Sequence, residues 1–322
     1  MVDSKQAPLD SAAAAKAAFA SVQDKPFPDD IFTAPELRWA VIGCGVIANQ
    51  MAQSLALAGR KLAGVANRTL SKAQAFAEQY GIEKVYESVE DLYADPGIDA
   101  VYITTPHNTH ITYLCDALAA GKHVLCEKAI TLNSAELDEA RTIADEHNVV
   151  LMDATTVLHM PLYQELRRRM DAGEFGRMNL AQLNFGSYKE YGDLTNRFYN
   201  RNLAGGAMLD IGVYALSVMR LFMASQPIEV VSLGNTCETG VDVAGGIVCR
   251  NAEQQLGVVS LTLHSKQPKR SIISFDKCYI EVNEYPRADH ATIVWTADGH
   301  REEVHAGTEA YALCYEMADL EK

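Results

Sequence analysis

Three side chains in the sequence could act together in proton transfer: Lys128, Asp210 and Tyr214. Asp210 and Tyr214 are four residues apart, so on a helix they share one face, and Gly212 between them adds no obstructing side chain. The pKa of a free tyrosine is about 10, which is too high for easy proton exchange at neutral pH. The ammonium of Lys128 would lower that pKa, and Asp210 could hold the lysine in place. The alternative is a capped helix with a tyrosine at the edge of the core.

Lys128 follows an apolar run at 123–126, directly after Glu127. A lysine at the end of a buried strand either projects into a ligand crevice or stays solvated at its rim. In the first case both residues lie beside the cofactor, and in the second Glu127 simply pairs with Lys128.

A glycine-rich turn follows the first apolar run, 37–42. Gly43 permits a tight turn, Gly45 lets the backbone approach a pyrophosphate, and Ala48 lets the following helix pack closely. The N–H groups at the start of that helix would point at the phosphates. Glycines also end strands for structural reasons, but the pattern favours a dinucleotide. The residues predicted to bind it here are Gly43, Gly45, Val46, Ile47 and Ala48.

The end of the second apolar run carries no carboxylate, although an acidic residue about 20 residues beyond the glycines is typical of NAD sites. The segment 66–72 offers Asn67 and Arg68 instead. Arg68 could clamp a 2′-phosphate bidentately, with Thr69 or Ser71 as donors, so the segment favours NADP over NAD. The alternative makes them turn and cap residues beside a solvated charge.

A polar turn follows the buried run at 100–104. Pro106 makes the turn rigid, and Asn108 or His110 could contact ribose or the nicotinamide amide, unless they only cap the next helix. The cofactor residues predicted here are Thr105, Pro106, Asn108 and His110.

Further along the chain, four side chains could contact substrate, or could instead be structural or solvated: His159, Lys189, Arg197 and Asn200.

The segment that positions these residues alternates short apolar runs with helical periodicity. The runs lie at 37–42, 62–66, 100–104, 123–126 and 149–152, and the amphipathic stretches at 47–58, 70–80, 109–119 and 133–147. This spacing predicts βαβ units in a doubly wound parallel sheet, with ligands beyond the carboxyl ends of the strands. We therefore expect an α/β Rossmann domain over residues 36–155.

After one more helix at about 162–172, strand-like runs dominate. They lie at 178–185, 228–234, 243–250, 255–263, 270–275, 278–283 and 291–296, and Asp298-Gly299 has the hairpin signal. Residues 156–322 are expected to form an α+β substrate domain around a large, mostly antiparallel sheet, whose open face suits subunit contact. Residues 1–35 are expected to form an arm outside the fold that grips a neighbouring subunit.

The composition of the chain argues against several classes of function. The 322 residues carry a formal net charge of −14, which argues against nucleic-acid binding. No apolar run approaches the roughly 20 residues of a membrane span, and the N-terminus is too polar for a secretory signal. The seven cysteines are scattered without Cys-x-x-Cys spacing, which favours free thiols in the cytoplasm and no metal site.

Together these motifs resemble the family of glucose–fructose oxidoreductase, inositol dehydrogenase and MocA proteins (Gfo/Idh/MocA), over residues 36–320. Six residues match its dinucleotide turn, its Glu-Lys-Pro motif and its Asp-Ile-Gly helix: Gly43, Gly45, Ala48, Glu127, Lys128 and Asp210. Many members carry His at the position of Tyr214. The tyrosine resembles the mostly NADP-linked branch of dimeric dihydrodiol dehydrogenase and xylose dehydrogenase.

The resemblance implies hydride transfer between nicotinamide and a carbinol of a sugar, polyol or cyclic diol. It also implies a C-terminal sheet that builds homodimers or homotetramers. Tyr214 would be the general acid/base. Lys128 would lower its pKa and polarise the substrate oxygen, and Asp210 would orient either Lys128 or a sugar hydroxyl. Two alternatives remain open: a non-catalytic NAD(P)-binding regulator, and an enzyme that retains its cofactor for glycoside cleavage or epimerisation.

One position departs from the family pattern. Ala129 replaces the proline of the Glu-Lys-Pro motif, whose peptide bond is often cis. A cis bond before a non-proline residue costs about 2.5–4 kcal/mol, so we expect a trans bond and a shifted Lys128.

Overall fold

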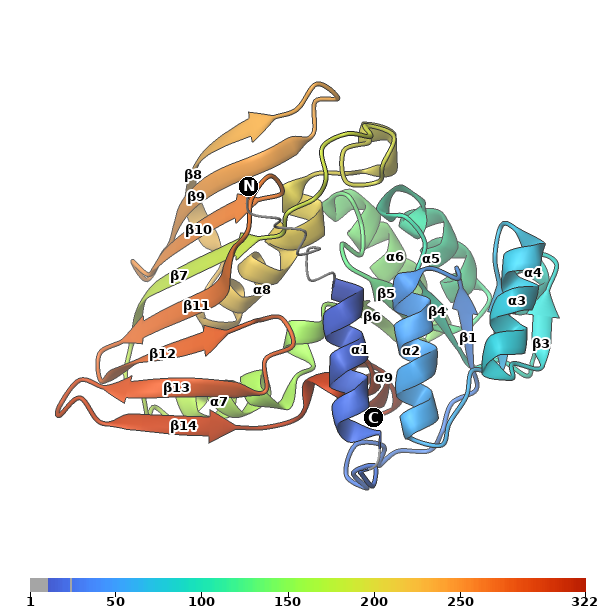
Figure 1. Ribbon diagram of the computed structural model, residues 1–322, viewed down its shortest axis with the longest axis horizontal. Helices are drawn as coiled ribbons and strands as arrows, with labels where there is room; N and C mark the ends of the chain where they lie inside the picture. Colours follow the sequence, from blue (N-terminus) through green and yellow to red (C-terminus); the bar gives the residue numbers. More distant parts are fainter. Residues whose placement is uncertain (1–10, 24) are drawn as a thin grey trace, which may run out of the picture.

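The computed structural model describes residues 11–23 and 25–322, with side chains from residue 17 onward. Two sheets lie side by side, each with its own helices (Figure 1). The first is a six-stranded parallel sheet in the order β3-β2-β1-β4-β5-β6. Its strands are β1 Trp39–Ile42, β2 Gly64–Ala66, β3 Lys84–Tyr86, β4 Ala100–Ile103, β5 His123–Glu127 and β6 Leu151–Ala154. This order is the Rossmann arrangement that the sequence predicts.

Helices cover both faces of this sheet. Its central strands β1 and β4 are therefore buried throughout. Two separate apolar clusters flank the sheet, one around Trp39 and Met51 and the other around Ile42 and Leu114. The helices are α2 Val46–Leu57, α3 Leu70–Tyr80, α4 Val89–Ala94, α5 His110–Ala119 and α6 Ser134–His147. The short elements β3 and α4 were not predicted.

The second sheet has eight strands in the order β14-β13-β12-β11-β7-β10-β9-β8. Only the pair β7–β10 is parallel, so the sheet is mostly antiparallel, as predicted. The strands are β7 Met178–Gly186, β8 Pro227–Thr236, β9 Asp242–Asn251, β10 Leu256–Thr262, β11 Gln267–Phe275, β12 Cys278–Asn283, β13 His290–Trp295 and β14 Arg301–His305. Helices α7 Pro161–Asp171 and α8 Val213–Phe222 pack on one face (Figure 1).

Two terminal segments differ from the expected division of the chain. The last helix, α9 Ala312–Glu321, returns to the first sheet, where Leu313 and Met317 join the cluster around Trp39. The opposite face of α9 packs against the described part of the expected N-terminal arm, which includes helix α1 Ser11–Val22. The expectation of an arm outside the fold is therefore wrong for these residues, because Val22 and Ile31 are buried against their own chain. Residues 1–10 lie outside the described part.

One helical stretch, Arg201–Phe222, is long and apolar enough to span a membrane, contrary to our reading of the sequence. Its apolar side chains, such as Val218 and Phe222, belong to the core of the second domain, which is typical of a buried core helix. Among the described residues all seven cysteines are free.

Candidate active site

Lys128 and Asp210 meet where the two domains face each other, beside a crevice that Asp210 helps to line, although 82 residues separate them. Lys128 directly follows β5, and its Nζ donates to the backbone oxygen of Asp210 at 2.6 Å and lies 3.3 Å from Oδ1. The two side chains are only 11% and 9% exposed. Burial would raise the pKa of Asp210, but the charges of Lys128 and Arg197 outweigh it and hold that pKa below its usual value.

A tightly packed turn places Asp210. Asp210 lies on a single π-helical turn, Met208–Gly212, which runs directly into α8. Asp242 accepts a hydrogen bond from the backbone N–H of Met208 at 2.7 Å, and a Cβ on Gly206 would lie 2.2 Å from the same carboxylate. Gly212 lets this turn pack closely against the sheet, because a Cβ there would lie 2.9 Å from Leu261 on β10. Its lack of a side chain does not open a path for a ligand.

Tyr214 completes the predicted set, with the face of its ring toward the lysine. Lys128 Nζ lies 4.9 Å from the ring centroid, and Phe185 stacks on the same ring at 6.0 Å. Burial raises the pKa of Tyr214 and the charge of Lys128 lowers it, with a net rise. The expected lowering is therefore wrong in its net direction, because the sequence gives no measure of burial. The structure makes Tyr214 a hydroxyl that keeps its proton at neutral pH.

The peptide bond between Lys128 and Ala129 is cis, so the expectation of a trans bond was wrong. The loop is held through His110, by contacts that the sequence does not reveal. The carbonyl oxygen of Ala129 lies 2.9 Å from Nδ1 of His110, whose Nε2 lies 2.8 Å from the oxygen of Thr105. His110 is fully buried, so it supports this loop rather than facing a ligand, contrary to its predicted cofactor contact.

The glycine turn has the geometry expected of a phosphate cradle. Gly43 has a φ of 103°, and a Cβ there would lie 2.6 Å from Oγ1 of Thr104. Gly45 is the N-cap of α2, and no atom lies within 4 Å of where its Cβ would be. Ala48 is fully buried, whereas Val46 is 65% exposed. The turn is therefore closely packed at Gly43 and Ala48 and open at Gly45 and Val46. The free N–H groups at the start of α2 lie on the open side, where a pyrophosphate could bind them.

Exposed polar groups surround the start of α3, the next helix. Arg68 and Thr69 are exposed, and Thr69 makes no side-chain capping bond, so the capping alternative is not supported for it. Asn67 donates to the backbone oxygen of Thr69 at 3.0 Å, which fixes the turn. Lys72, which sequence reasoning left unassigned, is close enough for its charge to act on Cys44 in the glycine turn. Arg68 and Lys72 therefore place two positive charges at the start of α3.

The polar turn after β4 lies at the crevice. Pro106 and Asn108 are exposed, and Thr105 accepts a hydrogen bond from the Thr109 hydroxyl at 2.9 Å. Sequence reasoning missed His107, which is buried and lies 3.2 Å from the carbonyl oxygen of Ala204. Burial and the charge of Lys128 lower its pKa to about 4, so it is neutral at physiological pH.

Two of the predicted substrate residues lie at this crevice. Arg197 Nη2 is 3.6 Å from Asp210, and both Arg197 and Lys189 lie over the ring of Phe198, at 4.2 and 4.3 Å. A cavity of about 20 Å³ is lined by Pro106, His107, Arg197, Phe198, Leu203, Ala204, Gly205 and Asp210. Asn200 is used locally, because its side chain accepts from the backbone N–H of Asn202.

One predicted substrate residue and one predicted cofactor residue are bonded inside the protein instead. His159 is buried between Oδ2 of Asp319 and the backbone oxygen of Asp153, both at 2.9 Å, so its predicted substrate contact is not met. Glu127 does not pair with Lys128 at the rim, because its carboxylate accepts a hydrogen bond from the hydroxyl of Tyr102. Burial raises the pKa of Glu127, and the bond from Tyr102 and the charge of Lys128 oppose that rise.

The fold and this site define a dinucleotide-binding α/β oxidoreductase, and two family models agree. The model described as "Oxidoreductase family, NAD-binding Rossmann fold" matches residues 37–155, and that of the "GFO/IDH/MocA C-terminal domain" matches residues 163–281. The chain belongs to the Gfo/Idh/MocA family of oxidoreductases, as the sequence motifs predict.

Individual relatives agree with this assignment. The chain is 32% identical over 254 residues to trans-1,2-dihydrobenzene-1,2-diol dehydrogenase of Mus musculus, covering 77% of this chain and 75% of that protein. The corresponding enzyme of Xenopus tropicalis is 31% identical, with coverages of 76% and 74%. A levoglucosan dehydrogenase solved with NADH and levoglucosan has the same fold, with a TM-score of 0.80 at 19% identity and coverages of 88% and 89%. The 3-ketoreductase KijD10 of Actinomadura kijaniata, solved with NADP, gives 0.77 at 24% identity with the same coverages.

Proposed function

We propose that this oxidoreductase is NADP-dependent and transfers hydride between nicotinamide and the carbinol of a sugar, polyol or cyclic diol. The observation that carries the proposal is the convergence of Lys128, Asp210 and Tyr214 beside the carboxyl end of β5. Ligands of doubly wound sheets bind at this edge. Relatives named as diol dehydrogenases support the substrate class.

Each of the three residues has a separate task. A bound nicotinamide supplies or accepts the hydride at its C4. Tyr214 donates the proton to the substrate oxygen in reduction. In oxidation its ionised form, a minor species at neutral pH, accepts that proton. Lys128 places a positive charge beside that oxygen and stabilises the charge that develops there. Asp210 fixes the ammonium by two contacts, so that Lys128 is already oriented before substrate binds.

The function is tested by incubating purified protein with NADP or NAD and a panel of sugars and cyclic diols. We expect the nicotinamide absorbance to show reduction with at least one member of the panel. Tight cofactor binding without turnover on any member would favour a regulatory protein. Cofactor that survives gel filtration without net reduction would favour the retained-cofactor enzyme.

We expect Arg68→Ala to weaken NADPH binding by roughly 10- to 100-fold, because hydrogen bonds to charged groups contribute about 1.5–3 kcal/mol. NADH binding should stay within about threefold of the wild type, since NADH lacks the 2′-phosphate that Arg68 would hold. Fluorescence titration of both dinucleotides measures the effect, with Arg301→Ala on the distant strand β14 as the control. Equal losses for NADPH and NADH would rule out the phosphate contact.

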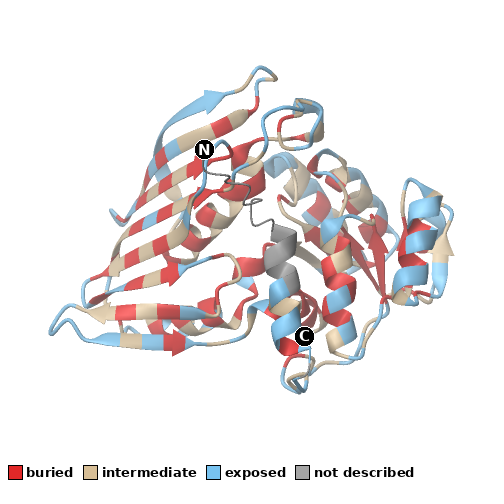
Figure 2. Ribbon diagram, viewed as in Figure 1, coloured by how far each residue is buried: buried red, intermediate tan, exposed pale blue. Residues whose placement is uncertain are grey.

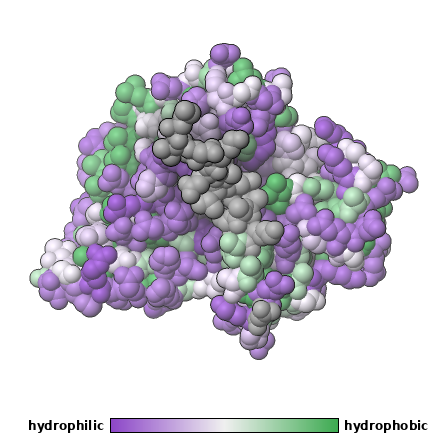
Figure 3. Space-filling view, viewed as in Figure 1, coloured by the Kyte–Doolittle hydropathy of each residue, from purple (hydrophilic) through white to green (hydrophobic). Residues whose placement is uncertain are grey.

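We further propose a cytoplasmic location, which suits the free thiols. We also propose that the protein forms a homo-oligomer through β8, the edge strand of the large sheet. Four apolar side chains of β8 are 62–84% exposed: Ile228, Val230, Val231 and Leu233. Figure 2 shows this strand as exposed, and Figure 3 shows apolar side chains gathered at the upper left, where Figure 1 places β8. Such an edge would otherwise be an aggregation hazard.

The double variant Val231→Lys, Leu233→Lys tests this surface, because the two side chains share one face of β8. Multi-angle light scattering should find an oligomer in the wild type and a monomer in the variant. The control variant Ser232→Lys places a lysine on the same strand but on its opposite face, and should keep more of the oligomer. A monomeric wild type would contradict the proposal.

A further inference from the structure

Arg197 lines the crevice beside Asp210 and is a cation that the proposed chemistry does not use. Its side chain is 56% exposed, and its Nη2 lies 3.6 Å from Oδ1 of Asp210, which is beyond hydrogen-bond distance. A guanidinium carries five N–H donors. In the described part of the chain, that of Arg197 donates no hydrogen bond. Its donors therefore face a crevice that solvent and ligands can reach.

The backbone around Arg197 is held by the turn that precedes Asp210. The N–H of Gly206 donates to the carbonyl oxygen of Phe198 at 3.0 Å. A Cβ on Gly205 would lie only 2.6 Å from the carbonyl oxygen of Arg197, so the two segments pack in direct contact. The ring of Phe198 then lies 4.2 Å from the guanidinium of Arg197. This packing presents the arginine at the crevice before any ligand binds.

Positive charge exceeds negative charge at this crevice. Lys128 and Asp210 carry opposite charges 3.3 Å apart, so they largely cancel each other. Arg197 and Lys189 remain, and both lie over the ring of Phe198, at 4.2 and 4.3 Å from its centroid. Two cations held at one ring repel each other, and an anion bound beside them would relieve that repulsion.

The buried carboxyl group of Glu127 does not cancel this excess. It accepts a hydrogen bond from Tyr102, and Glu127 is not among the residues that line the crevice. Arg287, from the loop between β12 and β13, also acts on Glu127 with its charge. When the charges of Glu127 and Arg287 are counted against each other, the positive excess at the crevice is unchanged.

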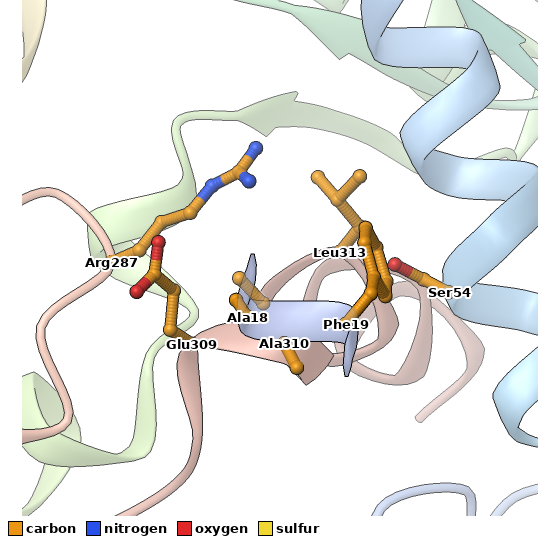
Figure 4. A pocket seen from close by; sticks show the side chains of 8 residues that line it. Ala18, Phe19, Ser54, Arg287, Glu309, Ala310 and Leu313 are labelled. Carbon is orange, nitrogen blue, oxygen red and sulfur yellow. The ribbon is translucent and has the colours of Figure 1, made fainter. Parts of the chain in front are cut away.

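Arg287 also shows how an arginine of this protein is engaged by its own chain. Its Nη2 donates to Oε1 of Gln50 on α2 at 3.1 Å, and its charge acts on Glu309. Figure 4 shows Arg287 and Glu309 at one side of a separate hollow, with Phe19 and Leu313 at the other. The guanidinium of Arg197, by contrast, is left with donors for a ligand.

The charge of Arg197 lies close to the reacting groups. Lys128 and Arg197 approach the same oxygen, Oδ1 of Asp210, at 3.3 and 3.6 Å. A substrate whose oxygen rests beside Lys128 and Tyr214 therefore reaches Arg197 with atoms only a few bonds away from that oxygen. An anionic group bound by Arg197 would belong to the same small molecule as the reacting carbinol.

We propose that Arg197 is a specificity-determining residue, which selects a substrate that carries a carboxylate or phosphate a few bonds from the reacting carbinol. The planar guanidinium offers paired N–H groups that match either anion. Lys189 adds a second positive charge beside the same site. The proposal rests on the proposed function and deepens it, because it narrows the substrate to an anionic sugar or polyol.

The test compares glucose and galactose with their uronic acids, aldonic acids and 6-phosphates, at constant ionic strength and saturating NADP. In the wild type we expect at least one anionic compound to exceed its neutral parent in kcat/KM by about tenfold or more. Arg197→Met should raise the KM of that compound by roughly 10- to 100-fold and change the KM of its parent by less than about threefold. A preference for an acid identifies a sugar acid as the substrate, and a preference for a 6-phosphate identifies a sugar phosphate.

Arg201→Met is the matched control, because Arg201 is a nearby exposed cation that does not line the crevice. It should leave every KM within about threefold of the wild type, since solvent and salt screen its charge. A wild type that prefers none of the anionic compounds would overturn the proposal. Equal losses of kcat/KM for anionic and neutral compounds in Arg197→Met would also overturn it, because Arg197 would then act only by holding Asp210.

A second readout does not need turnover. A ligand that binds the folded protein raises its Tm, so an anionic compound should raise the Tm of the wild-type protein with NADP more than its neutral parent does. This difference should disappear in Arg197→Met, and the same difference in both proteins would overturn the proposal. Weaker NADPH binding by Arg197→Met would assign the arginine to the cofactor and overturn it too. Absence of turnover with every compound would instead overturn the proposed function, while the Tm shifts would still decide whether Arg197 binds anions.

Discussion

Replacing Tyr214 by phenylalanine is expected to lower kcat by roughly 10²–10⁴-fold, because the reaction would lose its general acid/base. The ring itself would remain, so its stacking on Phe185 and its contact with Lys128 should persist. Cofactor affinity and Tm should therefore change little. Steady-state kinetics with the best member of the sugar and diol panel, together with a cofactor titration, separate these effects.

The control for this variant is Tyr279→Phe, which removes a hydroxyl from an exposed side chain of β12. It should keep wild-type kinetics. If kcat of Tyr214→Phe stayed within about threefold of the wild type, Tyr214 would not be the proton donor, and Lys128 would be the remaining candidate in this set. Because burial raises the pKa of Tyr214, oxidation by the wild type should also quicken as pH rises above neutral.

Replacing Arg60 by methionine is expected to lower the free energy of unfolding by about 3–5 kcal/mol, the usual cost of removing one partner of a buried ion pair. The side chains of Arg60 and Glu321 are 10% and 1% exposed and meet at 2.6 Å. Without the arginine, the Glu321 carboxylate would keep only the N–H of Leu37 and the indole N–H of Trp39. The pair ties α9 to the loop after α2, and the bond from Trp39 ties the same carboxylate to β1.

Urea unfolding at neutral pH measures this loss. Arg168→Met is the matched control, because Arg168 pairs with Glu165 on the surface of α7. Exposed pairs of this kind contribute at most about 1 kcal/mol. Equal losses in the two variants would contradict the account of α9 as an element held by a buried charge pair.

The strongly periodic parts of the fold could be predicted from the sequence, and the short ones could not. Helix α3 and strand β12 occupy the predicted ranges, because each has a clear period and a turn residue at its end. Strand β3 has only three residues, none of them buried, so no alternation marks it. Strand β14 carries mostly charged residues at the sheet edge, although the Asp-Gly turn before it was recognised.

The site was predictable where residues stand at the ends of elements, since parallel strands deliver such residues to one edge. That rule brought Lys128 to the crevice, and helical spacing put Asp210 and Tyr214 beside it. Burial was not predictable, because it depends on packing between distant segments. It reverses the expected net pKa shift of Tyr214 and removes His159 from the crevice.

The most direct test of the account follows the hydrogen itself. A sugar or cyclic diol from the panel that supports turnover is prepared with deuterium on the reacting carbinol carbon and incubated with the protein and NADP. The account predicts that mass spectrometry finds this deuterium in the nicotinamide ring of the reduced cofactor, at a rate that collapses in Tyr214→Phe. Oxidised substrate whose deuterium appears in water, with none in the nicotinamide, would contradict hydride transfer at this site.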